Sequence, residues 1–280
     1  MITLNNVTFG YKKREPIFKN MNLELEGGHI YGLLGKNGVG KTTLLKIICG
    51  LRFAQEGVIN ILDTPAQWRQ ASILQNIYYL GEEIAAPNLS IHHFLRAYAP
   101  FYPNFNYEQM DTYLEQFEIT NMRQKISSMS HGEKKKVFIA FALATNVKIL
   151  LMDEPTNGLD IPSKSMFRKV MSMAADNERL FLISTHQVRD LHSLIDAIVL
   201  LDKGEIIVAE STDNITEKLL FKIVDDLNEA PNAIYTEDTI RGIYTVSPNI
   251  YHEENKLDIE LFFNAVLHNK KKIKEIFHQF

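Results

Sequence analysis

The sequence predicts an α/β fold that carries a helical insertion and ends in a small C-terminal α+β extension. Short apolar runs alternate with helical patterns over residues 1–212, as in layered α/β proteins. A stretch rich in helical patterns and aromatic side chains interrupts this alternation at about residues 84–145. A polar turn at residues 211–214 then indicates a boundary, with a smaller accessory domain expected at residues 213–280.

Five segments are expected to be strands of the main domain. His29–Leu34 is a short apolar run that precedes a glycine-rich turn and a helix at Lys41–Cys49, and Gly50 suits the left-handed position after that helix. A turn at residues 202–204 leads into a strand at Glu205–Ala209. The other three runs end in polar residues, as buried parallel strands do: Lys148–Asp153, Leu180–Ser184 and Ala197–Asp202.

The C-terminal extension shows both strand-like and helical patterns. Its strand-like pieces are Leu219–Val224, Gly242–Val246 and Leu257–Leu261. A helical end follows, with four apolar residues on one side: Ile273, Ile276, Phe277 and Phe280. Three interpretations of this end stay open: it packs on its own chain, it joins two tails in a dimer, or its lysines contact an anionic membrane.

Composition excludes several function classes. The chain has 30 Lys and Arg against 34 Asp and Glu, so it lacks the basic surplus expected of a nucleic-acid-binding protein. The longest apolar run, Val137–Ala144, is far shorter than the roughly 20 residues that a membrane-spanning helix needs. No secretory signal is expected, and a single cysteine, Cys49, fits a reducing cytoplasm.

Residues Gly35–Thr42 fit the phosphate-loop pattern G-x-x-x-x-G-K-[ST] between a predicted strand and a predicted helix. Glycines let successive backbone N–H groups face one anion, and the helix N-terminus adds its positive dipole end. Lys41 would reach the β- and γ-phosphates, and the Thr42 hydroxyl would bind Mg²⁺. The alternative is a glycine-rich turn with a solvated lysine.

A second set of residues follows a buried strand. Asp153 and Glu154 come directly after the apolar run at residues 149–152. At the carboxyl end of such a strand, Asp153 would hold Mg²⁺ through water and Glu154 would polarise the attacking water as a general base. The alternative is two surface acids at a strand end. It is disfavoured because the phosphate loop is also present.

These motifs and others in the same order resemble the ATP-binding cassette (ABC) ATPases over residues 1 to about 212. Met129–Glu133 is similar to the family's signature, Asp153–Asp160 to its joined Walker B motif and D-loop, and Ile183–His186 to its switch histidine. Tyr11 stands where the family has its adenine-stacking aromatic, with Phe9 as a neighbouring candidate. The resemblance implies a P-loop NTPase fold with a mixed sheet core and a helical subdomain.

The resemblance also implies roles for particular residues. Two cassettes would pair head to tail with two ATP molecules between them, and Ser130, Gly132 and Glu133 would contact the nucleotide of the partner. Glu154, His186 and Lys41 would be catalytic, and Asp160 would belong to the D-loop. Mg²⁺ would be held by Thr42, Asp153 and Glu82. The ATP-binding set would be Tyr11, Gly35, Asn37, Gly38, Gly40, Lys41, Thr42 and Thr43.

Three positions depart from the family pattern. Glu82 stands where the family has the glutamine of its Q-loop, which places an extra negative charge beside the triphosphate. His131 replaces the first glycine of the signature, and Glu133 replaces its glutamine, which leaves the expected ribose contact in doubt. Ser130 and Glu133 also fit an ordinary helix capping box, a role that is compatible with anion binding.

The resulting hypothesis is an ATP-binding and ATP-hydrolysing subunit of an ABC transporter, with an exporter of drugs or lipids favoured. Its partners would be a transmembrane permease in a separate chain and a second cassette in a homodimer or heterodimer, with no nucleic acid. It would lie on the cytoplasmic face of the cell membrane. The aromatic run at residues 98–107 would dock the permease or fill the helical core. The alternatives are a soluble non-transport ABC ATPase and an ATP-sensing regulatory module.

Overall fold

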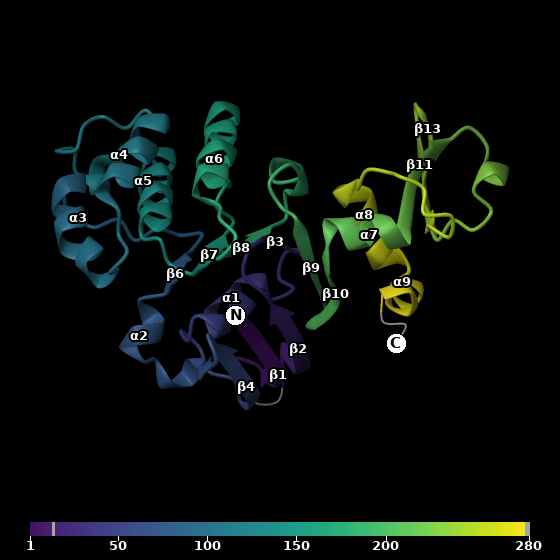
Figure 1. Cartoon of the computed structure of the whole chain (residues 1–280), viewed down its shortest axis with the longest axis horizontal. Helices are drawn as coiled ribbons and strands as arrows, with labels where there is room; N and C mark the ends of the chain where they lie inside the picture. Colours follow the sequence, from purple (N-terminus) through teal and green to yellow (C-terminus); the bar gives the residue numbers. More distant parts are fainter. Residues whose placement is uncertain (13–14, 278–280) are drawn as a thin grey trace.

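The computed structural model describes residues 1–12 and 15–277. Two sheets form the body of the molecule, and a third belongs to the C-terminal extension (Figure 1). The N-terminal sheet is antiparallel, in the order β2 (Phe18–Leu25), β1 (Ile2–Phe9), β4 (Glu56–Ile61) and β5 (Thr64–Pro65). Helix α1 (Lys41–Ile48) shares one apolar core with this sheet and with one face of the central sheet.

The central sheet has six strands, and all five strands expected from the sequence lie in it. Their spatial order is β10 (Glu205–Ser211), β9 (Ala197–Asp202), β3 (His29–Leu34), β8 (Leu180–Thr185), β7 (Ile149–Asp153) and β6 (Ile77–Leu80). All neighbours are parallel except β10, which runs antiparallel to β9. The sheet is therefore mixed, and the carboxyl ends of β3, β7 and β8 meet at one edge, where a ligand site is expected.

The stretch at residues 84–145 forms a helical layer beside the sheet, at the left of Figure 1. It contains α3 (Ile91–Tyr98), α4 (Tyr107–Gln116) and α5 (His131–Ala144). Its aromatic side chains divide into two groups. Tyr102 and Phe105 pack on Phe141 with ring centroids 6.0 and 5.3 Å away, whereas Phe101 and Tyr107 are 65% and 55% exposed. The aromatic run thus contributes both to the helical core and to an open surface.

Three further helices and five short 3₁₀ turns occur among residues 1–12 and 15–277. The helices are α2 (Ala71–Leu74), α6 (Ile161–Ala174) and α7 (Thr212–Lys218). The turns are Ala66–Trp68, Ala99–Phe101, Ile126–Ser128, Val188–Asp190 and Leu227–Glu229. Within the described residues, no helix is both long enough and apolar enough to cross a membrane.

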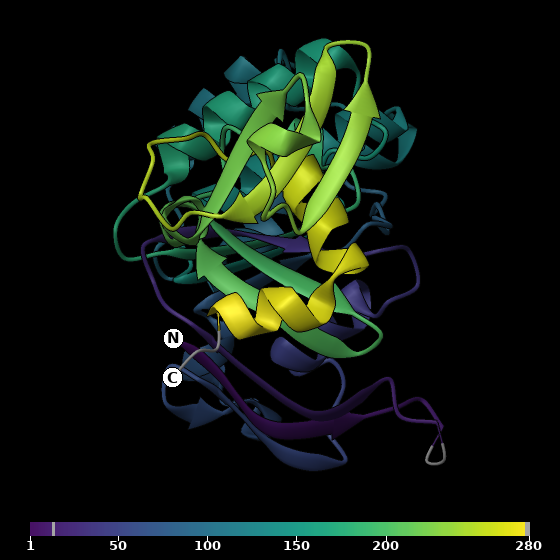
Figure 2. The same ribbon diagram turned by 90° about the vertical axis from the view of Figure 1, so that its right-hand side faces the viewer.

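The C-terminal extension is a three-stranded antiparallel sheet with two helices (Figure 2). The sheet runs β11 (Leu219–Val224), β13 (Gly242–Pro248) and β12 (Tyr235–Thr239), and the helices are α8 (Ile259–His268) and α9 (Lys270–Phe277). Phe221 packs edge-on against Phe262 of α8. One continuous apolar core includes the helical layer, the central sheet and this extension.

The strand predicted at Leu257–Leu261 is wrong, because α8 begins at Ile259. The Asp258 carboxylate accepts a hydrogen bond from the Leu261 N–H at 3.0 Å and so caps the helix. Ile259, Phe262 and Val266 are buried on one face, which is helical spacing. A three-residue alternation is too short to outweigh that cap and pattern.

Helix α9 packs on its own chain. Ile273 and Phe277 are buried and Ile276 is partly buried, whereas Phe280 lies outside the described residues. Lys270 forms an ion pair with Asp202, and Lys274 forms one with Glu205, both at the β9–β10 turn. These contacts favour the first of the three interpretations of the helical end, because two of its lysines are already paired inside the chain.

Candidate nucleotide-binding site

A cleft of about 610 Å³ opens at the carboxyl ends of the central strands. It is lined by residues from five separate parts of the sequence, which the fold brings to one edge. Those predicted from the sequence are Tyr11, Asn37, Gly38, Gly40, Lys41, Thr42, Thr43, Glu82, Asp153, Glu154 and His186. Ile17 also lines it and was not predicted, and so does Asn157, which belongs to the predicted motif Asp153–Asp160 but had been given no role in the site.

The loop between β3 and α1 has the backbone geometry of an anion cradle. Gly38 and Gly40 have φ angles of 78° and 111°, in the left-handed region that favours glycine. A Cβ on Gly40 would also lie 2.9 Å from the ring of Phe18, so this position excludes any side chain. Gly40 precedes the first turn of α1, whose free N–H groups and dipole point toward the cleft.

Lys41 is buried, with only 7% of the residue exposed. Its ammonium donates hydrogen bonds to the carbonyl oxygens of Gly35 at 2.7 Å and Lys36 at 3.3 Å. Burial lowers the pKa of Lys41, and the negative charges of Glu154, Asp153 and Glu82 act against that shift. The cleft therefore holds one partly desolvated cation that is suited to bind phosphate oxygens.

Asp153, at the end of β7, is held by three hydroxyl groups. Thr42 donates to its Oδ2 at 2.7 Å, Tyr79 donates to the same oxygen at 3.4 Å, and Ser184 donates to its Oδ1. Burial and the nearby Asp153 charge raise the pKa of Tyr79 above its ordinary value, so this hydroxyl stays a donor. Tyr79 and Ser184 lie on the strands next to β7, and neither was predicted as a site residue.

Glu154 and His186 lie in direct contact. The Nδ1 atom of His186 is 2.8 Å from the Oε1 atom of Glu154. Glu154 has a φ of 47°, an unusual value for a residue with a side chain, and its N–H donates to the Ser184 carbonyl at 3.1 Å. The predicted base and the predicted switch histidine thus form one hydrogen-bonded unit across the ends of β7 and β8.

Glu82 forms part of the cleft wall. Its Oε1 atom accepts a hydrogen bond from the Asn157 amide at 2.9 Å. The structure thus brings a third carboxylate close to Asp153 and Glu154, at the position where the family pattern has a neutral amide. Its charge contributes to the electrostatic field around Lys41.

The oxygen atoms in this cleft fit Mg²⁺. Thr42 and Asp153 already meet at 2.7 Å, and Glu82 faces the same space. Among residues 1–12 and 15–277, no group of three or more His, Cys, Asp or Glu side chains is arranged to hold a metal alone. Mg²⁺ bound through few protein oxygens together with substrate phosphates is the arrangement expected of nucleotide sites.

Tyr11 lies at the open side of the cleft and is 58% exposed. Its hydroxyl is 3.3 Å from the Thr43 hydroxyl, and its ring meets the Phe9 ring edge-on with centroids 5.3 Å apart. Phe9 is buried in the core, so Tyr11 is the ring of the two that has a face available for a base.

The signature and D-loop residues lie outside this cleft. Ser130 caps α5: its hydroxyl accepts from the Glu133 N–H at 3.2 Å, and its N–H donates to the Glu133 carboxylate at 2.8 Å. Asp160 caps α6 by accepting from the Ser163 N–H at 2.9 Å. Gly132 lies in the first turn of α5. These groups have no contact with the nucleotide cleft of their own chain.

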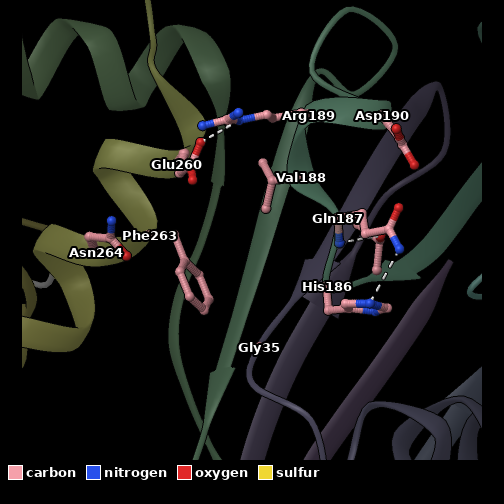
Figure 3. A pocket seen from close by; sticks show the side chains of 10 residues that line it. Gly35, His186, Gln187, Val188, Arg189, Asp190, Glu260, Phe263 and Asn264 are labelled. Atoms are coloured by element: carbon pink, nitrogen blue, oxygen red, sulfur yellow. Dashed lines mark hydrogen bonds and ion pairs between the residues drawn. The ribbon is translucent and has the colours of Figure 1, made fainter.

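A second pocket, of about 410 Å³, lies between the segment after His186 and helix α8 (Figure 3). Gly35 lines this pocket and not the nucleotide cleft. At this pocket, Arg189 forms an ion pair with the Glu260 carboxylate at 2.6 Å. Phe263 and Asn264 line it from α8. On the other side, Lys164 pairs with Asp190 at 2.7 Å. The C-terminal extension therefore contacts the segment that follows His186.

Comparison with known sequences agrees with this geometry. A family model described as ABC transporter matches residues 18–157. The Bacillus subtilis ABC transporter ATP-binding protein NatA is 27% identical over 87% of this chain and all of its own length. The linearmycin resistance ATP-binding protein LnrL of the same organism is 27% identical over 96% of this chain and 87% of its own. The zinc uptake ATP-binding protein ZnuC of that organism is 26% identical over 73% of this chain and 92% of its own.

Solved structures share the fold. The ATP-binding subunit of an ABC transporter superposes with a TM-score of 0.70 and 23% identity, covering 77% of this chain and 91% of its own. The cassette MJ0796, in a dimeric post-hydrolysis state with ADP and Pi, superposes with a TM-score of 0.66 and 24% identity. It covers 75% of this chain and 98% of its own. At these identities the likeness establishes the architecture.

Proposed function

This chain belongs to the ABC transporter family as an ATP-hydrolysing cassette, and we propose that it drives an exporter through a permease carried on a separate chain. The expected fold class and ATPase activity are thereby confirmed, since the chain has the mixed sheet and helical layer of an ABC cassette. We also propose that two cassettes pair head to tail.

The contact between Glu154 and His186 carries the proposed mechanism. In hydrolysis a water oxygen bonds to the γ-phosphorus, the bond from that phosphorus to the bridging oxygen of ADP breaks, and the water gives up a proton. Glu154 would accept that proton, and the imidazole of His186 would hold the carboxylate in place while contacting the γ-phosphate. Lys41 would bind β- and γ-phosphate oxygens, and bound Mg²⁺ would neutralise part of their charge.

Two residues outside the cleft support a head-to-tail dimer. Ser130 and Gly132 lie at the N-terminus of α5, where backbone N–H groups favour an anion, but outside their own chain's nucleotide cleft. We propose that a second cassette brings its bound ATP against them. The similar cassette MJ0796 was solved as a dimer, which supports this arrangement.

A permease partner would dock on the helical layer. Tyr98, Phe101 and Tyr107 are all more than two-fifths exposed there. Exposed aromatic residues are enriched in protein interfaces, and such a contact would place this chain on the cytoplasmic face of the membrane. Changing Phe101 to Ser should then release the chain from its permease, while changing the similarly exposed Trp68, outside the helical layer, to Ser should not.

Export is favoured by the share of this chain that each relative covers in the alignment. LnrL, named for resistance to linearmycin, matches 96% of this chain and so includes most of the C-terminal extension. ZnuC, named for zinc uptake, matches only 73%. The proposal is that the extension accompanies the exporter type of cassette.

The experiment is to purify the chain from native membranes, identify the permease that accompanies it, and reconstitute both in vesicles with ATP outside. Export predicts that ATP drives the substrate into vesicles whose cassettes face outward. Substrate leaving such vesicles would show import, and recovery of the chain without any membrane protein would contradict the transporter assignment.

A further inference from the structure

Lys135 joins the signature helix to the backbone of the catalytic turn. It lies on α5, five positions after Ser130, and its side chain is fully buried. Its ammonium donates hydrogen bonds to the carbonyl oxygen of Glu154 at 2.7 Å and to that of Asn157 at 2.9 Å. The two bonded residues belong to the turn after β7, which carries the base of the chain's own site.

Fold stability alone does not account for a charge at this position. Burial lowers the pKa of Lys135, and the negative charges of Glu82, Glu154 and Asp153 act against that shift. Within the part of the chain that the structure describes, none of these carboxylates forms an ion pair with the Lys135 ammonium. Burying a cation costs desolvation free energy unless its partners are well placed, and an apolar side chain of similar length would fill the space without that desolvation cost. What the lysine adds is two directed hydrogen bonds.

Those bonds fix a residue that is held in an uncommon conformation. Glu154 has a left-handed φ of 47°, which persists only where its surroundings hold it. Its N–H is bound by Ser184 and its carbonyl oxygen by Lys135, so both peptide groups of the residue are fixed. The direction of the Glu154 side chain, and hence its contact with His186, depends on these two supports.

We propose that Lys135 is a positioning residue that couples the signature end of α5 to the catalytic base. The proposal rests on the head-to-tail dimer described above. When the nucleotide of the partner cassette binds at Ser130, α5 moves or stiffens as a rigid helix. Lys135 transmits this change to the turn through its hydrogen bonds to the carbonyl groups of Glu154 and Asn157. Hydrolysis in one site would thereby depend on nucleotide held in the other.

The test compares Lys135→Met, Lys135→Gln and Lys136→Met by steady-state ATP hydrolysis and by titration calorimetry with ATP. Lys135→Met removes both hydrogen bonds, Lys135→Gln retains a donor, and Lys136→Met removes a charge from the same helix where the side chain is partly exposed. We expect Lys135→Met to lower kcat by about tenfold or more with KM within about twofold. Lys135→Gln should recover part of that loss, and Lys136→Met should stay within about twofold of wild type.

A second measurement separates coupling from local structure. In Lys135→Met, adding Ser130→Ala should cause little further loss, because both changes interrupt one path and their effects should not add. Wild-type kcat in Lys135→Met, additive losses in the double variant, or equal losses in kcat and ATP affinity would overturn the proposal. If Lys135→Met does not fold, the same comparison of kcat is made with Lys135→Gln alone and combined with Ser130→Ala, and the same outcomes support or overturn the proposal. Failure of wild type itself to dimerise with ATP would instead refute the proposed dimer.

Discussion

The Nδ1 atom of His186 lies 2.8 Å from the Oε1 atom of Glu154, and this contact joins the ends of two parallel strands into one hydrogen-bonded unit. Only 9% of the Glu154 side chain is exposed, against 35% for His186. Both residues line the nucleotide cleft, and the imidazole is the more exposed of the two, so it can contact the carboxylate and still reach a bound phosphate.

Replacing His186 with Ala should lower kcat for ATP hydrolysis about tenfold or more while ATP affinity changes little, because the contact with Glu154 matters mainly in the transition state. Steady-state kinetics and titration calorimetry measure the two quantities. His192→Ala, at an exposed histidine outside the cleft, is the matched control. Parallel losses of kcat and affinity would assign His186 a binding or folding role.

Replacing Glu154 with Gln should keep ATP binding, stop turnover and trap an ATP-bound dimer. The amide is similar in size to the carboxylate but cannot accept the proton of the attacking water. Phosphate release and sedimentation with ATP test the two parts, and Glu83→Gln, at an exposed neighbour of the cleft, serves as control. Native turnover in the Glu154 variant would exclude this residue as the base.

Replacing Lys41 with Ala should abolish measurable binding of Mg-ATP. The change removes a buried cation whose charge-assisted hydrogen bonds to phosphate are each worth about 1.5–3 kcal/mol, so two such bonds account for a loss of roughly 100-fold or more. Titration calorimetry measures it, and Lys46→Ala, on the same helix away from the cleft, should bind normally. Wild-type affinity in the Lys41 variant would show that the phosphates bind elsewhere.

Replacing Glu82 with Gln should tighten the binding of ATP without Mg²⁺ by roughly severalfold, because it removes a negative charge beside the triphosphate. The amide oxygen of Gln can still accept the hydrogen bond from Asn157, so the loop geometry should persist. Titration with ATP in the presence and absence of Mg²⁺ should show a smaller metal dependence in the variant. An unchanged ratio would mean that Glu82 contributes nothing to the metal site.

The sequence predicted the parts of the site whose signal is local. The glycine spacing around Lys41 and the apolar run before Asp153 each lie within about ten residues and needed no knowledge of distant partners. Strand β1 was missed because it contains an irregularity between Leu4 and Val7, with Asn6 at a φ of 51°, which breaks the alternation of buried and exposed residues.

Lys135 could not be identified from the sequence, because its partners are backbone carbonyl groups. Such groups are present at every residue and carry no composition signal. The same holds for Tyr79 and Ser184, whose hydroxyl groups reach Asp153 only because the strand order places β6 and β8 on either side of β7. Long-range pairing of this kind appears only when the fold is known.

A chain that ends at Asn214 should keep ATP binding but lose stability. All residues that line the nucleotide cleft lie before residue 187. The removed part, however, shares the apolar core with β10 through Ile207 and Val208 and pairs two lysines of α9 with the β9–β10 turn. We therefore expect ATP affinity within about threefold of wild type and a Tm lower by about 5 °C or more.

Two measurements on this shortened chain decide what the extension does. Calorimetry with ATP tests the division at residue 212, since a folded shortened chain without nucleotide binding would show that the division is wrong. Sedimentation without ATP tests pairing: if the full chain is a dimer and the shortened one a monomer, the extension joins two cassettes. If both are monomers, the packing of Ile273 and Phe277 on the chain's own core accounts for α9. The double variant Lys270→Ala/Lys274→Ala, which loses only the ion pairs, should then lower Tm less than the truncation, with Lys271→Ala as its control.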